Sequence, residues 1–71
     1  MLTPARRGAL SARQIEILQM LADGKSPKEV ARQLRISTQT VKNHLAGVRQ
    51  ALGVRKTAAA AAVAFCRGLI Q

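Results

Sequence analysis

The residues whose types and spacing suggest chemistry lie in one predicted helix, from about residue 37 to residue 52. An apolar residue recurs there every three or four positions, at Val41, Leu45, Val48 and Leu52. At about 100° per residue these side chains share one face, which predicts that this face is core. The opposite face carries small and uncharged polar residues and no acid, whereas an ordinary surface helix displays mixed charges. We therefore expect this face to lie in a groove of an acidic partner.

The polar face has amide side chains, and its edge has cationic ones, of the types that read the edges of nucleic-acid bases. Asn and Gln can pair with two atoms of an adenine edge, and Lys or Arg can read guanine. The candidate base-reading residues are Gln39, Lys42, Asn43, Ala46 and Gln50. Ala46 and the neighbouring Gly47 leave room for close approach of the backbone, although a glycine inside a helix costs about 1 kcal/mol.

The first turn of the same helix is a candidate phosphate site. Its amides have no partner within the helix, and the positive end of the helix dipole attracts anions. Hydroxyl side chains lie in this turn, and basic side chains lie at neighbouring helix ends and on the flank of the helix. The candidate DNA-backbone residues are Lys25, Lys28, Arg35, Ser37, Thr38, Thr40 and Arg49. Such contacts would position the domain without reading sequence.

The charge of the chain favours a nucleic-acid partner. Twelve Lys and Arg stand against three Asp and Glu, for a net charge of +9 at pH 7. All three acids precede Val30, and the basic residues after it have no counter-charge. This distribution is typical of a protein that binds a polyphosphate. A charge excess for solubility is the alternative, and a membrane surface is disfavoured because Phe65 is the only aromatic residue.

Length and composition exclude several other classes. The 71 residues suffice for one small domain, and the single cysteine permits no internal disulfide. The longest apolar run, residues 58–66, is far shorter than the roughly 20 residues that a membrane span needs. The chain has no paired carboxylates, no nucleophile beside a base and no glycine-rich phosphate loop, so we expect no enzyme activity, cofactor or metal. We expect a cytoplasmic, reducing setting.

Helix punctuation predicts an all-α fold of four helices. Capping-box sequences stand at residues 11–14 and 26–29. A short helix ending near Leu34, a three-residue link and the longer helix form the pattern of a helix-turn-helix. Thr57 is expected to cap the last helix. We expect residues 1–9 to be a flexible basic arm or a linker stub, and residues 10–71 to be the domain.

The segment "LSARQIEILQMLADGKSPKEVARQLRISTQTVKNHLAGVRQALGV" resembles the LuxR-type helix-turn-helix domain of many transcriptional regulators. The resemblance runs from Leu10 to about Ile70. It implies that the third helix, about residues 37–52, enters the major groove of double-stranded DNA and that the fourth often forms a homodimer. The chain is either a complete small regulator or the C-terminal domain of a larger one.

The resemblance also assigns roles to particular positions. It implies that Lys42 and Asn43 enter the groove or read bases, and it makes Ala46 a further readout position. The residues that match backbone contacts of the family are Lys28, Ser37 and Thr40. Ala46 departs from the family, where a longer polar residue is common, so specificity could rest on few bases or on DNA shape. Gln14 replaces the usual Glu and Ala51 the usual Lys.

The last helix, residues 57–67, poses a second question, because no polar side chain occurs from residue 58 to residue 66. A helix that is apolar all round is normally buried on more than one side, although alanine also tolerates exposure as the best helix former. The predicted core stripe is Ala58, Ala61, Ala62, Phe65 and Leu69. The opposite face is expected to form a two-fold contact between two copies, with interface residues Ala60, Val63, Ala64 and Arg67.

Two other functions stay open from the sequence. One is a protein-interaction module that docks RNA polymerase or another regulator through the basic face. The other is RNA binding, which is disfavoured because stacking aromatic residues are missing. His44 is interpreted as a packed structural residue and Cys66 as a small hydrophobic residue.

Overall fold

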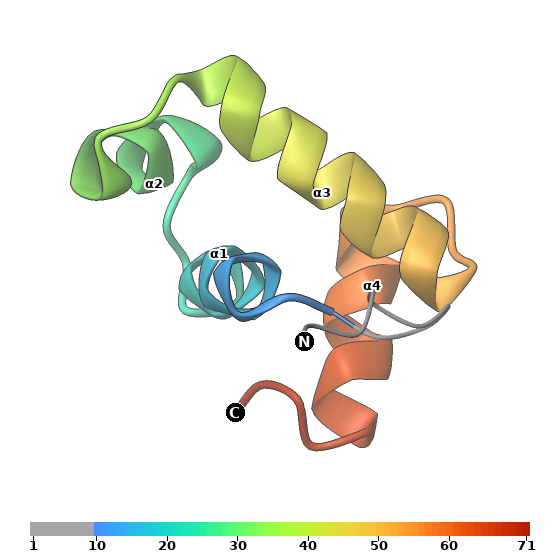
Figure 1. Ribbon diagram of the computed structural model, residues 1–71. Coiled ribbons are helices and arrows are strands. Elements are labelled where there is room, and N and C mark those ends of the chain that lie inside the picture. The colour runs from blue at the N-terminus through green and yellow to red at the C-terminus, as the bar shows by residue number, and fades with distance from the viewer. Residues whose placement is uncertain (1–9) are drawn as a thin grey trace, which may run out of the picture.

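The computed structural model describes residues 10–71, and in this part of the chain all regular secondary structure is helical (Figure 1). The predicted four helices and the helix-turn-helix spacing are confirmed. The helices are α1 (Ala12–Ala22), α2 (Pro27–Leu34), α3 (Thr38–Leu52) and α4 (Thr57–Cys66). The expected basic arm, residues 1–9, lies outside the described residues. None of the helices between residues 10 and 71 has the length and apolar character needed to cross a membrane.

Reciprocal capping determines where the first two helices begin. The Gln14 N–H donates to Ser11 Oγ at 3.1 Å, and the Ser11 N–H donates to Gln14 Oε1 at 2.9 Å. Ser26 and Glu29 form the same pair of bonds at the start of α2, at 3.1 and 2.8 Å. Each box gives partners to amides that the helix itself leaves without one. Both capping boxes were predicted, and both are confirmed.

The core is built around α3, which packs against the three other helices (Figure 1). The N-terminal half of α3 lies beside α2 and its C-terminal half beside α4, and α1 lies between α2 and α4. The predicted core face of α3 is confirmed, because each of its four apolar side chains is at most 8% exposed. They pack against buried side chains of α1 and α2, of which the largest that are fully buried are Ile17, Leu18 and Val30.

The predicted orientation of α4 is wrong. Ala60 and Ala64, expected on the outer face, are fully buried, whereas Phe65, expected in the core, is 64% exposed. Ala58 and Ala62 are exposed as well. The reason is that ten residues of nearly uniform hydropathy have no apolar side, so their pattern does not say which face turns inward. Packing against α3 and α1 decides it, and the two buried alanines let α4 approach closely.

The start of α4 also differs from the prediction. Its N-cap residue is Lys56, which makes no side-chain capping bond, and Thr57 is the first helical residue. The Thr57 hydroxyl instead accepts a hydrogen bond from Arg49 Nη1 of α3, at 3.1 Å. A tertiary contact therefore uses the oxygen that was expected to serve as a local cap.

The chain after α4 folds back onto α1. The Leu69 N–H donates to the Ala64 carbonyl at 2.8 Å, and Ile70 is 4% exposed in the core. The Gln19 side chain accepts from the Gln71 N–H at 2.7 Å and donates to the Gln71 carbonyl at 2.8 Å. One side-chain amide thus pairs with both backbone groups of a residue 52 positions away.

Candidate nucleic-acid interface

The exposed side of α3 carries every residue that the sequence suggested for base reading. All five are exposed, with Lys42 on the flank of α3 and the other four on the side turned away from its buried face. They are Gln39, Lys42, Asn43, Ala46 and Gln50. The stripe holds three amides, one ammonium and one methyl group, and no acid. A helix of this kind can present hydrogen-bond donors and acceptors to base edges in a groove of DNA.

Two members of this stripe are joined by a hydrogen bond that sequence reasoning missed. Gln39 Nε2 donates to Asn43 Oδ1 at 3.0 Å. The two residues are four positions apart, so their side chains are neighbours on the helix surface. This spacing was the feature of the sequence that could have predicted the hydrogen bond. The two amides are therefore presented together rather than separately.

The first turn of α3 is closed by its own hydroxyl groups. Ser37 Oγ accepts from the Thr40 N–H at 3.0 Å and lies 2.8 Å from Thr40 Oγ1. Ser37 is exposed, whereas Thr38 and Thr40 are half-buried. The amides of Thr38 and Gln39 precede the first intrahelical hydrogen bond, so they keep their donors for an external acceptor. This end of α3 can therefore bind an anion such as a phosphate group.

The turn between α2 and α3 contains a residue with strained backbone. Arg35 ends α2 with φ 59° and ψ 44°, and it is the only non-glycine residue with positive φ among residues 10–71. Side chains other than that of glycine adopt this conformation at a cost of roughly 1–2 kcal/mol. The guanidinium belongs to an exposed residue two positions before Ser37. The arginine therefore keeps a positive charge beside α3 at a position where glycine would be less strained.

The start of α2 adds two further cations beside one acid. Lys25 and Lys28 are exposed, as is Glu29. Hydrogen bonds from the backbone and then the side chain of Ser26 lower the pKa of the Glu29 carboxyl, and the nearby Lys25 and Arg32 charges lower it further. Glu29 is therefore ionised at neutral pH and partly offsets the positive charge of this corner.

Arg49 lies apart from the other candidate backbone residues. It is half-buried in the last turn of α3, and its guanidinium donates to Thr57 of α4. The remaining candidates belong to α2, to the loops at its two ends and to the first turn of α3. In this structure Arg49 thus links α3 to α4 instead of joining that group.

Gly47 has a packing role that the sequence did not reveal. It is half-buried, and a Cβ atom at this position would lie 2.8 Å from Gln14 Nε2 of α1. The expectation that Gly47 clears space for an external partner is therefore replaced by a close contact between α1 and α3. No signal in the local sequence pairs the two positions, because they belong to different helices.

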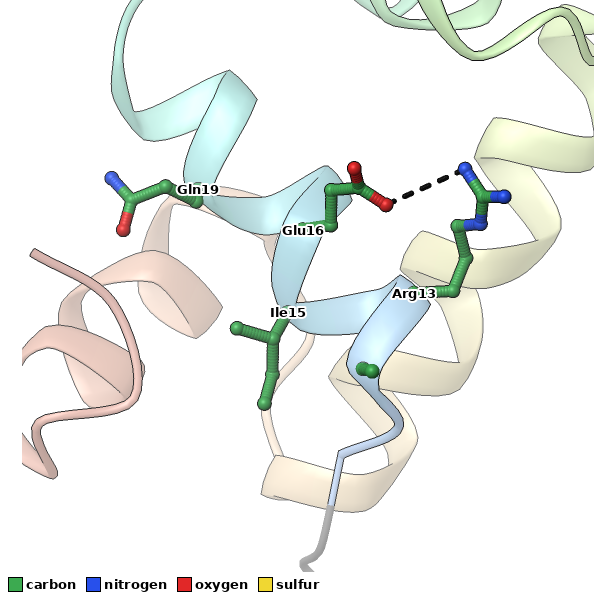
Figure 2. Close-up of a pocket in the computed structure, with 5 residues that line it drawn as sticks. Arg13, Ile15, Glu16 and Gln19 are labelled. Atoms are coloured by element: carbon green, nitrogen blue, oxygen red, sulfur yellow. Dashed lines mark ion pairs between the residues drawn. The ribbon is translucent and has the colours of Figure 1, made fainter.

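A shallow open pocket on α1 does not resemble a ligand site. It is lined by Ala12, Arg13, Ile15, Glu16 and Gln19 (Figure 2). Arg13 Nη1 lies 3.4 Å from Glu16 Oε1, and the two side chains are 44% and 53% exposed. Figure 2 shows the Ile15 and Gln19 side chains pointing away from this ion pair. An exposed pair of this kind contributes at most about 1 kcal/mol and is ordinary helix surface.

Comparison with known proteins identifies the fold and the family. The family model of bacterial regulatory proteins, luxR family, matches residues 8–64. The chain belongs to this family. It is therefore a LuxR-type helix-turn-helix DNA-binding domain of transcriptional regulators, and the family is not one of enzymes. The expectations of fold, family and DNA binding are confirmed.

Individual relatives of this LuxR-family domain agree with that assignment. It is 55% identical over 53 residues to the protein YhjB of Escherichia coli (strain K12), covering 75% of this chain and 26% of YhjB. It is 41% identical over 68 residues to the quorum sensing-dependent transcriptional regulator RpaR of Rhodopseudomonas palustris (strain ATCC BAA-98 / CGA009), covering 96% of this chain and 28% of RpaR. The chain therefore spans about a quarter of the length of these two curated relatives.

A solved structure of the transcription factor GerE superimposes on this LuxR-family domain with a TM-score of 0.84. The two chains are 35% identical, and the match covers 87% of this chain and 92% of GerE.

Proposed function

We propose that the domain binds double-stranded DNA at a specific sequence, with α3 in the major groove, and that it thereby regulates transcription. The exposed stripe of α3 carries this proposal, because it combines base-reading side chains with a complete absence of acids. The major groove admits an α-helix and presents a distinct donor and acceptor pattern for each base pair. An ordinary solvated helix surface would not need three amides on one face.

Two sets of residues would contact different parts of the DNA, namely the base edges and the phosphates. Lys42 and Asn43, supported by Gln39, Ala46 and Gln50, would meet the base edges, and the Ala46 methyl group is suited to a thymine methyl group. The residues that would hold phosphates are Lys25, Lys28, Arg35, Ser37, Thr38 and Thr40. Contacts of the second set would fix the register of α3 on the duplex without reading its sequence.

The test is a selection from random duplex DNA, followed by anisotropy titrations of the recovered sequences across a salt series. We expect one enriched motif. Asn43→Ala should cost about 1–3 kcal/mol at one base pair of the motif, whereas Lys28→Ala should weaken binding to all sequences and lower the salt slope by about 1. Arg13→Ala removes a charge from α1, outside the interface, and should leave the preference of the wild type. Uniform, salt-sensitive binding with no motif would contradict the proposal.

We also propose that two copies associate through α4, by a surface that differs from the predicted one. Ala60 and Ala64 are buried and Val63 is half-buried, so the exposed apolar residues are Phe65 and its neighbours. The surface consists of Ala58, Ala62, Phe65 and Cys66, with Arg67 at its end. An exposed phenylalanine beside small apolar residues is typical of a protein interface. A two-fold pair would place the α3 helices about one DNA turn apart, on half-sites roughly 10 bp from centre to centre.

Light scattering of the protein alone and on DNA with two half-sites tests this association. Phe65→Glu should remove the dimer and the cooperativity of binding. Gln33→Glu introduces the same charge at an exposed position of α2 and should change neither. Independent binding of wild-type monomers to the two half-sites would refute the α4 dimer.

The alternative of docking to RNA polymerase has no separate observation in its favour. Its basic candidates Lys25, Lys28, Arg35 and Lys42 are the same exposed residues that we assign to DNA. Binding to DNA would place the protein in the cytoplasm, in agreement with the expectation from its composition.

A further inference from the structure

The hydrogen bond between Gln39 and Asn43 gives the Asn43 amide a direction. Because Gln39 Nε2 donates to Asn43 Oδ1, the oxygen of Asn43 faces Gln39 and its Nδ2 group faces away from it. An isolated asparagine amide can turn by 180° and exchange these two ends. In the structure the bond sets Asn43 Oδ1 toward Gln39, and reversal of both amides together would preserve a bond, so the bond couples the direction of the Asn43 amide to that of the Gln39 amide.

No other helix neighbour of Asn43 offers a competing bond. Thr40, three residues before it, is half-buried, and its hydroxyl lies 2.8 Å from Ser37 Oγ. Ala46 and Gly47, three and four residues after it, have no polar side-chain atom. These are the positions whose side chains adjoin residue 43 on a helix, together with residue 39. Gln39 is therefore the polar partner that this part of α3 supplies.

The direction of the amide matters to a base edge. Adenine presents an acceptor at N7 beside a donor at N6, so a matching amide must place its donor and acceptor in one order. A reversed amide would set donor against donor and acceptor against acceptor. Phosphate contacts fix the register of the helix, so the protein does not recover the match by shifting along the duplex. Oδ1 still has a second lone pair for the base after it accepts from Gln39.

We propose that Gln39 is a positioning residue, which holds the Asn43 amide in one orientation and so selects the base pair that Asn43 reads. This inference rests on the mode of DNA binding proposed above. It changes the role expected for Gln39, which acts through Asn43 instead of reading a base on its own.

Three substitutions at residue 39 give three different expectations in the selection from random duplex DNA. Gln39→Ala removes the partner and should reduce discrimination at the Asn43 base pair by about twofold, the factor of one exposed hydrogen bond between side chains four residues apart on a helix. Gln39→Lys keeps a donor toward Oδ1 and should keep the base preference. Gln39→Glu offers only acceptors, so it should attract Nδ2, reverse the amide and shift the preference to a different base at that one position.

Gln50→Glu is the matched control for the added negative charge, because residue 50 is exposed on the same stripe two turns from Asn43. It should weaken binding without shifting the preference at the Asn43 base pair. Residue 39 is exposed, so circular dichroism melts of all variants should overlap. The inference is overturned if Gln39→Ala and Gln39→Glu keep the wild-type preference and only weaken binding uniformly. Absence of any wild-type motif is a different result, since it overturns the proposed function itself and this inference with it.

Discussion

Replacement of Gly47 by alanine tests the contact between α1 and α3. Alanine favours a helix interior over glycine by about 1 kcal/mol, so Gly47→Ala should stabilise α3 if nothing else changes. The new Cβ would, however, lie 2.8 Å from Gln14 Nε2, too close for a real contact. The same Gln14 amide accepts from the Ser11 N–H at 2.9 Å. Moving that side chain away from residue 47 therefore weakens the capping box of α1.

The two effects are of similar size. Loss of a capping interaction costs roughly 0.5–1 kcal/mol at an exposed helix start. Gly47→Ala should therefore change the free energy of unfolding by less than about 0.5 kcal/mol in the wild type. In a Gln14→Ala background the obstacle is already absent, and the same substitution should stabilise by about 1 kcal/mol. The coupling between the two positions is then about 0.5–1 kcal/mol.

Urea unfolding of the wild type, both single variants and the double variant, followed by circular dichroism, measures this coupling. The slope with urea should be the same in all four proteins if only native-state stability changes. A gain of 1 kcal/mol corresponds to a rise of about 4–8 °C in Tm for a domain of this size. Equal effects of Gly47→Ala in both backgrounds would refute the assignment of Gln14 as the obstacle. DNA affinity should not change, because Gly47 lies on the flank of α3 that faces α1.

Two further predictions concern the corner formed by α2 and the turn. Arg35→Gly should raise the free energy of unfolding by about 0.5–1 kcal/mol. It removes backbone strain of roughly 1–2 kcal/mol, and the greater entropy of glycine in the unfolded state offsets part of that gain. The substitution should also weaken DNA binding, because a positive charge is lost. Arg35→Ala should weaken binding equally without the gain, and equal stability of the two variants in urea would count against strain at this turn. The pKa of Glu29 is lower in the folded protein than its ordinary value of 4.5. Ionised Glu29 therefore stabilises the fold at pH values above 4.5, and this stabilisation is lost as the pH falls through the lower pKa of the folded protein. Glu29→Gln retains a capping partner for Ser26 without titrating, so urea titrations from pH 7 to pH 3 should show wild type losing stability relative to the variant, and parallel curves would contradict this.

The recognition surface could be predicted because α3 has a strong apolar period. Its four core residues leave only one side for the polar stripe, and no packing choice in the rest of the molecule changes that assignment. The capping boxes were equally predictable, since Ser11 and Gln14 lie within one turn and their bonds need no distant partner. The i, i+4 spacing could have predicted a contact between Gln39 and Asn43, but the direction of the Asn43 amide required the atomic positions of both side chains.

The sequence-based predictions that were wrong concern contacts between helices. The sequence by itself determined the helices, their capping boxes and the exposed face of α3, because those features depend on residues a few positions apart. Only the tertiary structure decided which side of α4 is buried, since a run of alanines has no apolar direction until Ala60 and Ala64 meet the core. It also decided that Thr57 bonds Arg49 and that Gly47 makes room for Gln14. Each of those pairs joins two different helices, and local periodicity carries no information about how two helices are packed.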